Sequence, residues 1–76
     1  MPKIQPLPWQ KLARVFELDG WVQARIKGDH IAYVKAGFSR PVIVPKWKEV
    51  AVFIIKNNLK TARMSRERYF ELLGEI

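Results

Sequence analysis

Hydrophobic residues near the start of the chain repeat at helical spacing. Trp9, Leu12, Ala13 and Phe16 fall on one stripe of an amphipathic helix. Pro8 suits the first turn of such a helix because an N–H group has no intrahelical partner there. Asp19-Gly20 follows the stripe, and glycine readily adopts the left-handed conformation that ends many helices. The pattern predicts a helix over about residues 8–18.

The next segment alternates with the period of a strand. Val22, Ala24 and Ile26 point one way and the basic or polar residues between them the other, which predicts a half-buried strand with a basic outer face over residues 21–27. Gly28-Asp29 predicts a tight hairpin turn. A second strand is expected over residues 30–36, where both faces carry apolar residues, so its buried side stays open. The segment 42–44, enclosed by prolines, predicts a short edge strand.

The last part of the chain returns to helical spacing. Apolar residues after Trp47 predict a helix from near Lys48 to Asn57-Asn58, with asparagine as its left-handed end. Residues 59–64 are expected to form a connector. Ser65 is a suitable N-cap for a short final helix that ends near Gly74.

The order helix, three strands, helix, short helix defines the expected fold. A three-stranded antiparallel sheet is covered by packing the helices on one face. The other face then stays open, with Arg25 and Lys27 on it. We therefore expect an α+β fold of αβββα type, the architecture of double-stranded-RNA-binding domains, with a short extra C-terminal helix. At 76 residues, the chain is expected to be one domain over residues 1–76.

Composition narrows the chemistry. The chain has no cysteine and one histidine, His30, which excludes disulfides and thiolate sites and disfavours a zinc site. No apolar run has the length of a membrane span, and the N-terminus lacks the apolar stretch of a signal peptide. We expect a soluble cytoplasmic protein without metal, cofactor or membrane contact.

Charge points to the partner. The formal net charge is +7, and residues 21–48 hold six Lys and Arg against one acidic residue. Such a surface favours nucleic acid, while an acidic protein partner or simple solubility are the alternatives. Four rings are interleaved with these charges and could stack on bases or serve as core: Trp21, Tyr33, Phe38 and Trp47.

Several short motifs together resemble the HicA-type toxins of bacterial toxin–antitoxin pairs. In order, they are Asp19-Gly20-Trp21, residues 27–33 (KGDHIAY), Val42-Ile43-Val44-Pro45, and residues 65–73 (SRERYFELL). The resemblance covers roughly residues 10–73, and the order and spacing of the motifs carry more weight than any single one.

The resemblance implies a double-stranded-RNA-binding-like fold and a metal-independent ribonuclease that cuts messenger RNA. It implies that the catalytic histidine is His30 and that a HicB-type antitoxin blocks the site. Two departures stand out. Asp29 occupies the usual position of a serine, and Ile31 replaces a common second histidine.

Cleavage of RNA without a metal requires a base, an acid and cations that stabilise the phosphorane. Histidine can be the base or the acid. If His30 is the base, the acid is a lysine, Tyr33 or water. Neighbours on a strand point to opposite faces, so no Asp29–His30 pair is predicted. The expected RNA-binding cations are Lys27 and Lys46 at the phosphate and Arg25, Lys35 and Lys48 along the backbone.

Two functions follow from the sequence. The first is an endoribonuclease toxin that uses His30. The second is a non-catalytic RNA-binding module or degenerate toxin, suggested by Asp29 and by the missing second histidine. A weaker third possibility is a basic face that binds an acidic protein.

Overall fold

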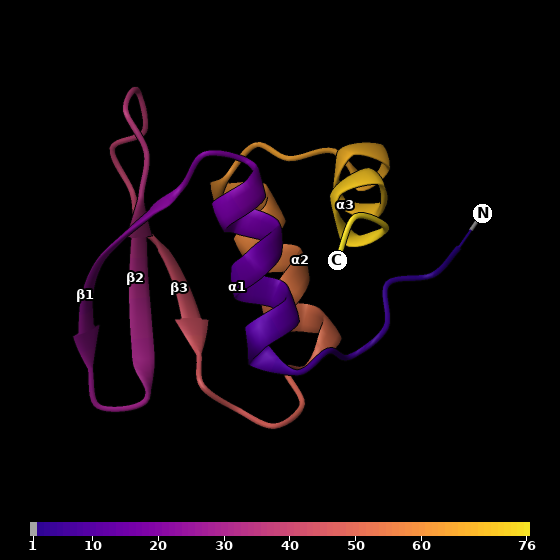
Figure 1. Cartoon of the computed structure of the whole chain (residues 1–76), viewed down its shortest axis with the longest axis horizontal. Helices are drawn as coiled ribbons and strands as arrows, with labels where there is room; N and C mark the ends of the chain where they lie inside the picture. Colours follow the sequence, from indigo (N-terminus) through magenta and orange to yellow (C-terminus); the bar gives the residue numbers. More distant parts are fainter. Residues whose placement is uncertain (1) are drawn as a thin grey trace.

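The computed structural model describes residues 2–76 as one antiparallel sheet with three helices on one side of it (Figure 1). The strand order is β1-β2-β3. The elements are α1 (Trp9–Leu18), β1 (Val22–Lys27), β2 (His30–Val34), β3 (Val42–Pro45), α2 (Val52–Thr61) and α3 (Arg66–Leu73). This confirms the predicted αβββα fold with a short third helix. Across residues 2–76, no helix has both the length and the apolar character that a membrane crossing requires.

The ends of α1 are close to the prediction. Pro8 is the N-cap residue, one position before the helix. At the other end Gly20 has φ +94°, and the Trp21 N–H donates to the Phe16 carbonyl at 2.9 Å. A second bond runs from the Gly20 N–H to the Glu17 carbonyl at 3.1 Å. These two bonds form a Schellman motif, in which glycine relieves the strain of the left-handed position.

The bounds predicted for the second helix are wrong. Val50 lies in an extended segment that exchanges two backbone hydrogen bonds with Leu7, so α2 begins only at Val52. Asn58 does not end the helix but is buried within it, and the left-handed residue is Arg63, with φ +53°. The N-cap of α3 is as predicted, because the Ser65 hydroxyl accepts a hydrogen bond from the Arg68 N–H at 3.0 Å.

The strand register decides which face of β2 is buried. Ile31 lies opposite Val44 and Tyr33 lies opposite Val42, and all four side chains are buried. Residues directly opposite one another share a face of the sheet. Ile31 and Tyr33 therefore point to the helices, while alternate residues, including His30, lie on the open face.

Strand β1 is not half-buried as predicted, because all six of its residues are exposed. The helices make their main sheet contacts with β3. Strand β1 is the opposite edge strand, and the helices do not cover it. A register shift between Gln23 and Arg25 also breaks the expected alternation. As a result Val22 lies opposite Val34 and shares the open face with Arg25 and Lys27, and it is 64% exposed.

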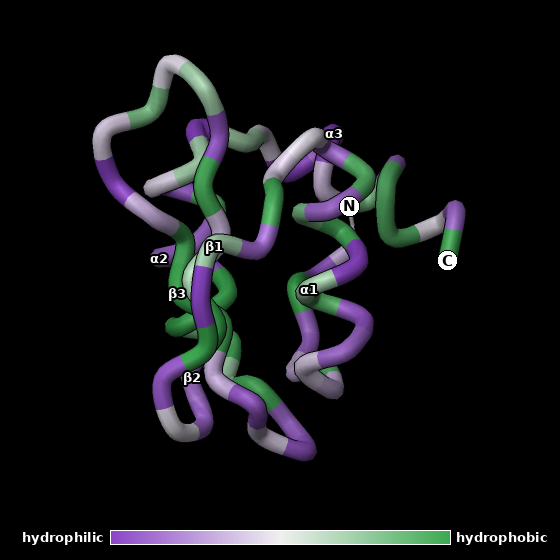
Figure 2. The backbone as a smooth tube through the Cα atoms, turned by 60° about the vertical axis from the view of Figure 1, so that its left-hand side comes forward, coloured by the Kyte–Doolittle hydropathy of each residue, from purple (hydrophilic) through white to green (hydrophobic). Residues whose placement is uncertain are grey.

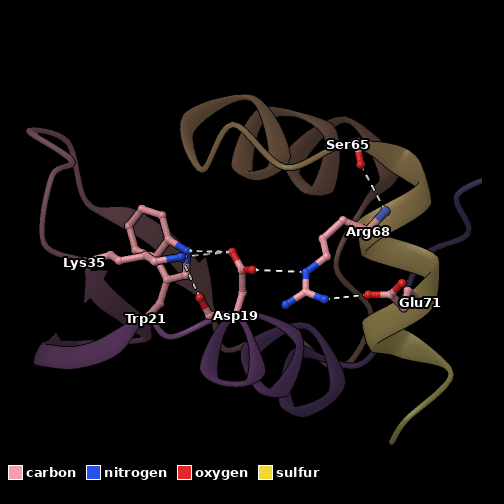
Figure 3. Close-up of polar contacts among 6 residues, drawn as sticks. All are labelled: Asp19, Trp21, Lys35, Ser65, Arg68 and Glu71. Atoms are coloured by element: carbon pink, nitrogen blue, oxygen red, sulfur yellow. Dashed lines mark hydrogen bonds and ion pairs between the residues drawn. The ribbon is translucent and has the colours of Figure 1, made fainter.

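Asp19 connects three parts of the fold (Figure 3). Its carboxylate accepts hydrogen bonds from the Trp21 indole and the Arg68 guanidinium, each at 3.3 Å. The Lys35 ammonium lies 3.6 Å from the same carboxylate and donates to the Asp19 carbonyl at 2.6 Å. Hydrogen bonds from Arg68 to Glu71 and Asp19 raise the pKa of that guanidinium. The end of α1, the end of β2 and helix α3 are thereby fixed together.

Candidate functional site

The lone histidine lies at the start of β2, directly after a two-residue turn. Gly28 in that turn has φ +59° and is followed by a residue with negative φ, the arrangement of a type II′ hairpin. The turn places Lys27 of β1 opposite His30, and Pro45 of β3 lies opposite His30 on the other side. The His30 side chain is 50% exposed. The imidazole is therefore accessible at the end of the open sheet face. Figure 2 shows the turn between β1 and β2 mainly in the colours of hydrophilic residues.

Asp29 contacts this histidine directly. Its Oδ1 atom lies 2.8 Å from Nδ1 of His30. The sequence prediction did not include this pair because it applied strand alternation, whereas Asp29 lies in the turn before the strand. The turn dipeptide was the signal that could have revealed the pair. The carboxylate can therefore pair with the imidazole when the ring carries a proton on Nδ1.

Two of the predicted cations share the open face with His30. Lys27 is its direct cross-strand neighbour, and Arg25 lies opposite Ala32, one position further along the same face. Both side chains are exposed. The positive charge they contribute is therefore available to an anion that contacts the imidazole.

Lys46 and Lys48 follow β3 at the same end of the sheet. The Lys46 N–H donates to the Asp29 carbonyl at 2.6 Å, which ties the end of β3 to the histidine turn. Its ammonium, however, lies over the Trp9 ring, 5.4 Å from the centroid. Lys48 is exposed in the segment between β3 and α2. The backbone of Lys46 therefore adjoins the site, while its charge is directed toward α1.

Lys35 is placed differently from the other predicted cations. It follows β2 at the end opposite His30, and its ammonium pairs with Asp19. The structure does not bring this lysine together with the imidazole.

Tyr33 is wrong as a candidate acid. The residue is buried on the helix side of the sheet, and its hydroxyl donates to Glu17 Oε2 at 3.0 Å. Burial, with the hydrogen bond and charge of Glu17, raises the pKa of Tyr33 to about 12. Among the sequence candidates, Lys27 and water remain as proton donors at the site.

The other acidic contacts lie away from the imidazole. Glu17 binds Tyr33, while Asp19 and Glu71 bind Arg68. In the described residues 2–76, no three His, Asp or Glu side chains gather closely enough to hold a metal ion.

Comparison with known families identifies the class of protein. A model of the HicA toxin of bacterial toxin–antitoxin systems matches residues 9–64, from the start of α1 to just after α2. The chain therefore belongs to the HicA toxin family, as its motifs indicated. Members of this family are toxins that pair with an antitoxin. No match to the chain is found among curated proteins or among solved structures.

Proposed function

We propose that this HicA-family toxin is a metal-independent endoribonuclease that cuts messenger RNA in the cytoplasm and is blocked by a HicB-type antitoxin. The observation that carries the proposal is the half-exposed imidazole of His30, paired at Nδ1 with Asp29. Lys27 lies opposite it on the open face of a basic chain. This arrangement supports the imidazole as the base, Asp29 as its partner and Lys27 as the cation in the cleavage of one phosphodiester.

Cleavage would begin when Nε2 of His30 takes the proton of a ribose 2′-hydroxyl. The 2′-oxygen attacks the adjacent phosphorus and the bond from phosphorus to the 5′-oxygen breaks. The leaving oxygen takes a proton from the Lys27 ammonium or from water. The products are a 2′,3′-cyclic phosphate and a 5′-hydroxyl end. Asp29 stabilises the imidazolium that forms, and Lys27 stabilises charge on the phosphorane.

The missing second histidine is compatible with this chemistry. Ile31 is buried on the helix side of β2, opposite Val44. A side chain at that position points away from the open face. A second histidine there would therefore not contact a substrate bound on that face.

The shape of the site favours an extended polymer. His30, Lys27 and Arg25 lie along an open sheet face rather than inside a cavity. A small metabolite gains little from a shallow surface, whereas an RNA strand contacts several exposed cations at once.

The test compares the purified wild-type chain with His30→Ala on a long RNA, with detection of new 5′-hydroxyl ends. General acid–base catalysis contributes about 10²- to 10⁴-fold, so His30→Ala is expected to lose activity by that order. Lys11→Ala is a matched control, because Lys11 is an exposed residue of α1. Equal cleavage by wild type and His30→Ala would exclude the catalytic role.

Asp29 also favours the second candidate, an RNA-binding protein that does not cut. Its exposed carboxylate is a negative charge beside the position of the scissile phosphate. This alternative predicts RNA affinity that falls steeply with salt and no cleavage products from the wild-type chain.

A further inference from the structure

A second basic surface lies at the end of the sheet opposite His30. The loop between β2 and β3 and the C-terminal end of α2 both lie at that end (Figure 1, top). An open groove of about 620 Å³ separates the two segments. Its lining includes Ser39, Arg40, Asn57, Lys60, Thr61 and Arg63.

The chemistry of the groove suits an anion. Three of its lining residues are cations, and none is acidic. Arg40, Lys60 and Arg63 form no ion pair with any side chain of residues 2–76, and all three are exposed. Hydroxyl and amide groups complete the lining and can donate further hydrogen bonds.

Arg63 is held in an unusual backbone conformation at this groove. It has φ +53° in the position after α2 that glycine usually occupies. The Met64 N–H closes the same Schellman bond to Leu59, at 2.9 Å, that glycine permits at the end of α1. An arginine strained in this way is consistent with a functional use of its side chain.

Aromatic contacts fix the direction of that side chain. The Arg63 guanidinium lies over the Phe38 ring, 5.4 Å from its centroid. Phe38 packs against the buried Trp21 ring at 4.8 Å, and the Lys35 ammonium lies 5.8 Å from its centroid. The Phe38 ring is therefore held by Trp21 and contacts both cations.

Helix stability alone does not account for this cluster. Lys60 lies in the last turn of α2 and complements the partial negative charge of the helix end. Arg40 belongs to the loop between β2 and β3, so it is not part of that helix. A cation contributed by a separate segment, facing the same groove, points to a ligand.

We propose that this groove binds phosphates of the RNA strand at a distance from the cleavage position, an inference that rests on the proposed function. His30 begins β2 and the groove lies beyond the other end of that strand, which spans about 13 Å at ordinary strand rise. One RNA can contact both places only if it extends over several nucleotides. The groove would then favour RNA that is long enough to reach from His30 past the far end of β2.

The experiment measures binding of a non-cleavable RNA, methylated at its 2′-hydroxyls, as a function of salt concentration. Three full-length proteins are compared: wild type, Arg40→Ala/Lys60→Ala, and the control Lys11→Ala/Lys56→Ala. The control removes the same charge from exposed positions outside the groove lining. If each groove cation binds one phosphate, the double variant has a salt slope shallower by about 1.4, while the control stays near wild type.

The length of the RNA gives an independent readout. Cleavage of a long RNA should be slower for the groove variant than for the control, whereas cleavage of a dinucleotide, which is too short to reach from His30 to the groove, should be equal. Equal weakening by both variants would show that only net charge matters and would overturn the proposal. A groove variant that loses binding to poly-glutamate but keeps its RNA binding would assign the groove to an acidic protein instead, which also overturns it.

The outcomes separate this proposal from the proposed function. If the wild type cleaves RNA and the groove variant binds and cleaves long RNA equally well, the groove proposal fails alone. If the wild type neither binds nor cleaves RNA, both fail. All four substituted side chains are exposed, so the variants are expected to fold. Thermal unfolding of the three proteins checks this.

Discussion

Nδ1 of His30 and Oδ1 of Asp29 are 2.8 Å apart, on side chains that are 50% and 62% exposed. The contact joins the last residue of a turn to the first residue of a strand. The contact brings a carboxylate beside an imidazole at an accessible surface. In the proposed cleavage, a carboxylate at this position stabilises the imidazolium that forms.

Asp29→Asn is therefore expected to slow RNA cleavage. Asparagine removes the negative charge that stabilises the imidazolium. Because both side chains are exposed, the pair is expected to contribute no more than about 1 kcal/mol, which is about fivefold in rate. Single-turnover cleavage against pH is the measurement. The affinity for non-cleavable RNA should hold or rise, because a negative charge is removed. Unchanged rates over the whole pH range would show that Asp29 does not act on His30.

Lys27→Ala and Lys35→Ala are expected to differ, although each removes one lysine. Lys27 lies opposite His30, so its removal should lower both cleavage rate and RNA affinity with little effect on stability. The Lys35 ammonium binds Asp19, so its removal should lower the free energy of unfolding by about 1 kcal/mol and affect cleavage less. Urea unfolding and cleavage assays of both variants make the comparison. A larger loss of cleavage and RNA affinity for Lys35→Ala than for Lys27→Ala would show that Lys35 belongs to the RNA-binding surface.

The sequence was sufficient to predict the order of the elements and the cap at Ser65, because these depend on local patterns. It was insufficient for β1, where alternation correctly indicated a strand but not its burial. Burial depends on how far the helices reach across the sheet, and a register shift after Gln23 moved Val22 to the open face. The second helix was misplaced because a long-range bridge between Leu7 and Val50 keeps that segment extended.

For the candidate site, the family resemblance indicated His30, and the structure shows the predicted Lys27 opposite it. The sequence did not predict the contact of Asp29 with His30, and it left Tyr33 as a candidate acid. Both shortcomings concern the direction in which a side chain points. A turn residue does not follow strand alternation, and the buried face of β2 was open at the sequence level. The basic groove could not be predicted from the sequence either, because it combines Arg40 with Lys60 and Arg63, which lie far along the chain at the end of a helix.

Two tyrosines provide a matched pair for stability. The Tyr33 hydroxyl binds Glu17, whereas the buried Tyr69 hydroxyl has no hydrogen-bond partner in residues 2–76. Tyr33→Phe should lower the free energy of unfolding by about 1 kcal/mol, and Tyr69→Phe should leave it unchanged or raise it. Urea unfolding at neutral pH measures both. Tyr33→Phe should keep full cleavage activity, because Tyr33 faces the helices.

Alkaline pH should destabilise the protein through the same residues. Burial is the largest cause that raises the pKa of Tyr33 and of Tyr69 to about 12. An unfolded tyrosine ionises near pH 10, so this contribution to stability is complete below about pH 10 and is lost as pH rises toward 12. Urea unfolding at about pH 8 and about pH 11 should show a smaller decline for Tyr33→Phe than for wild type. Parallel declines would contradict the raised pKa.

Asp19→Ala should be among the more damaging substitutions outside the core. Its carboxylate contacts Trp21, Lys35 and Arg68, and its side chain is 15% exposed. The loss of charged hydrogen bonds is expected to lower the free energy of unfolding by about 2–3 kcal/mol. The urea midpoint should fall with the m-value unchanged. Arg14→Ala, which removes an exposed pair with Glu17, is the control and should cost less than about 1 kcal/mol.

Arg63→Gly should separate stability from RNA binding. The left-handed conformation destabilises the folded state by about 1–2 kcal/mol for arginine but not for glycine. The cation–π contact of Arg63 with Phe38 stabilises it by about 0.5–1 kcal/mol. The glycine variant should therefore be as stable as wild type or slightly more stable. It should bind long RNA more weakly and with a shallower salt slope, because a groove cation is gone. Urea unfolding and salt-dependent binding of the same preparation test both. A variant that binds RNA as wild type does would mean that this arginine does not contact the RNA.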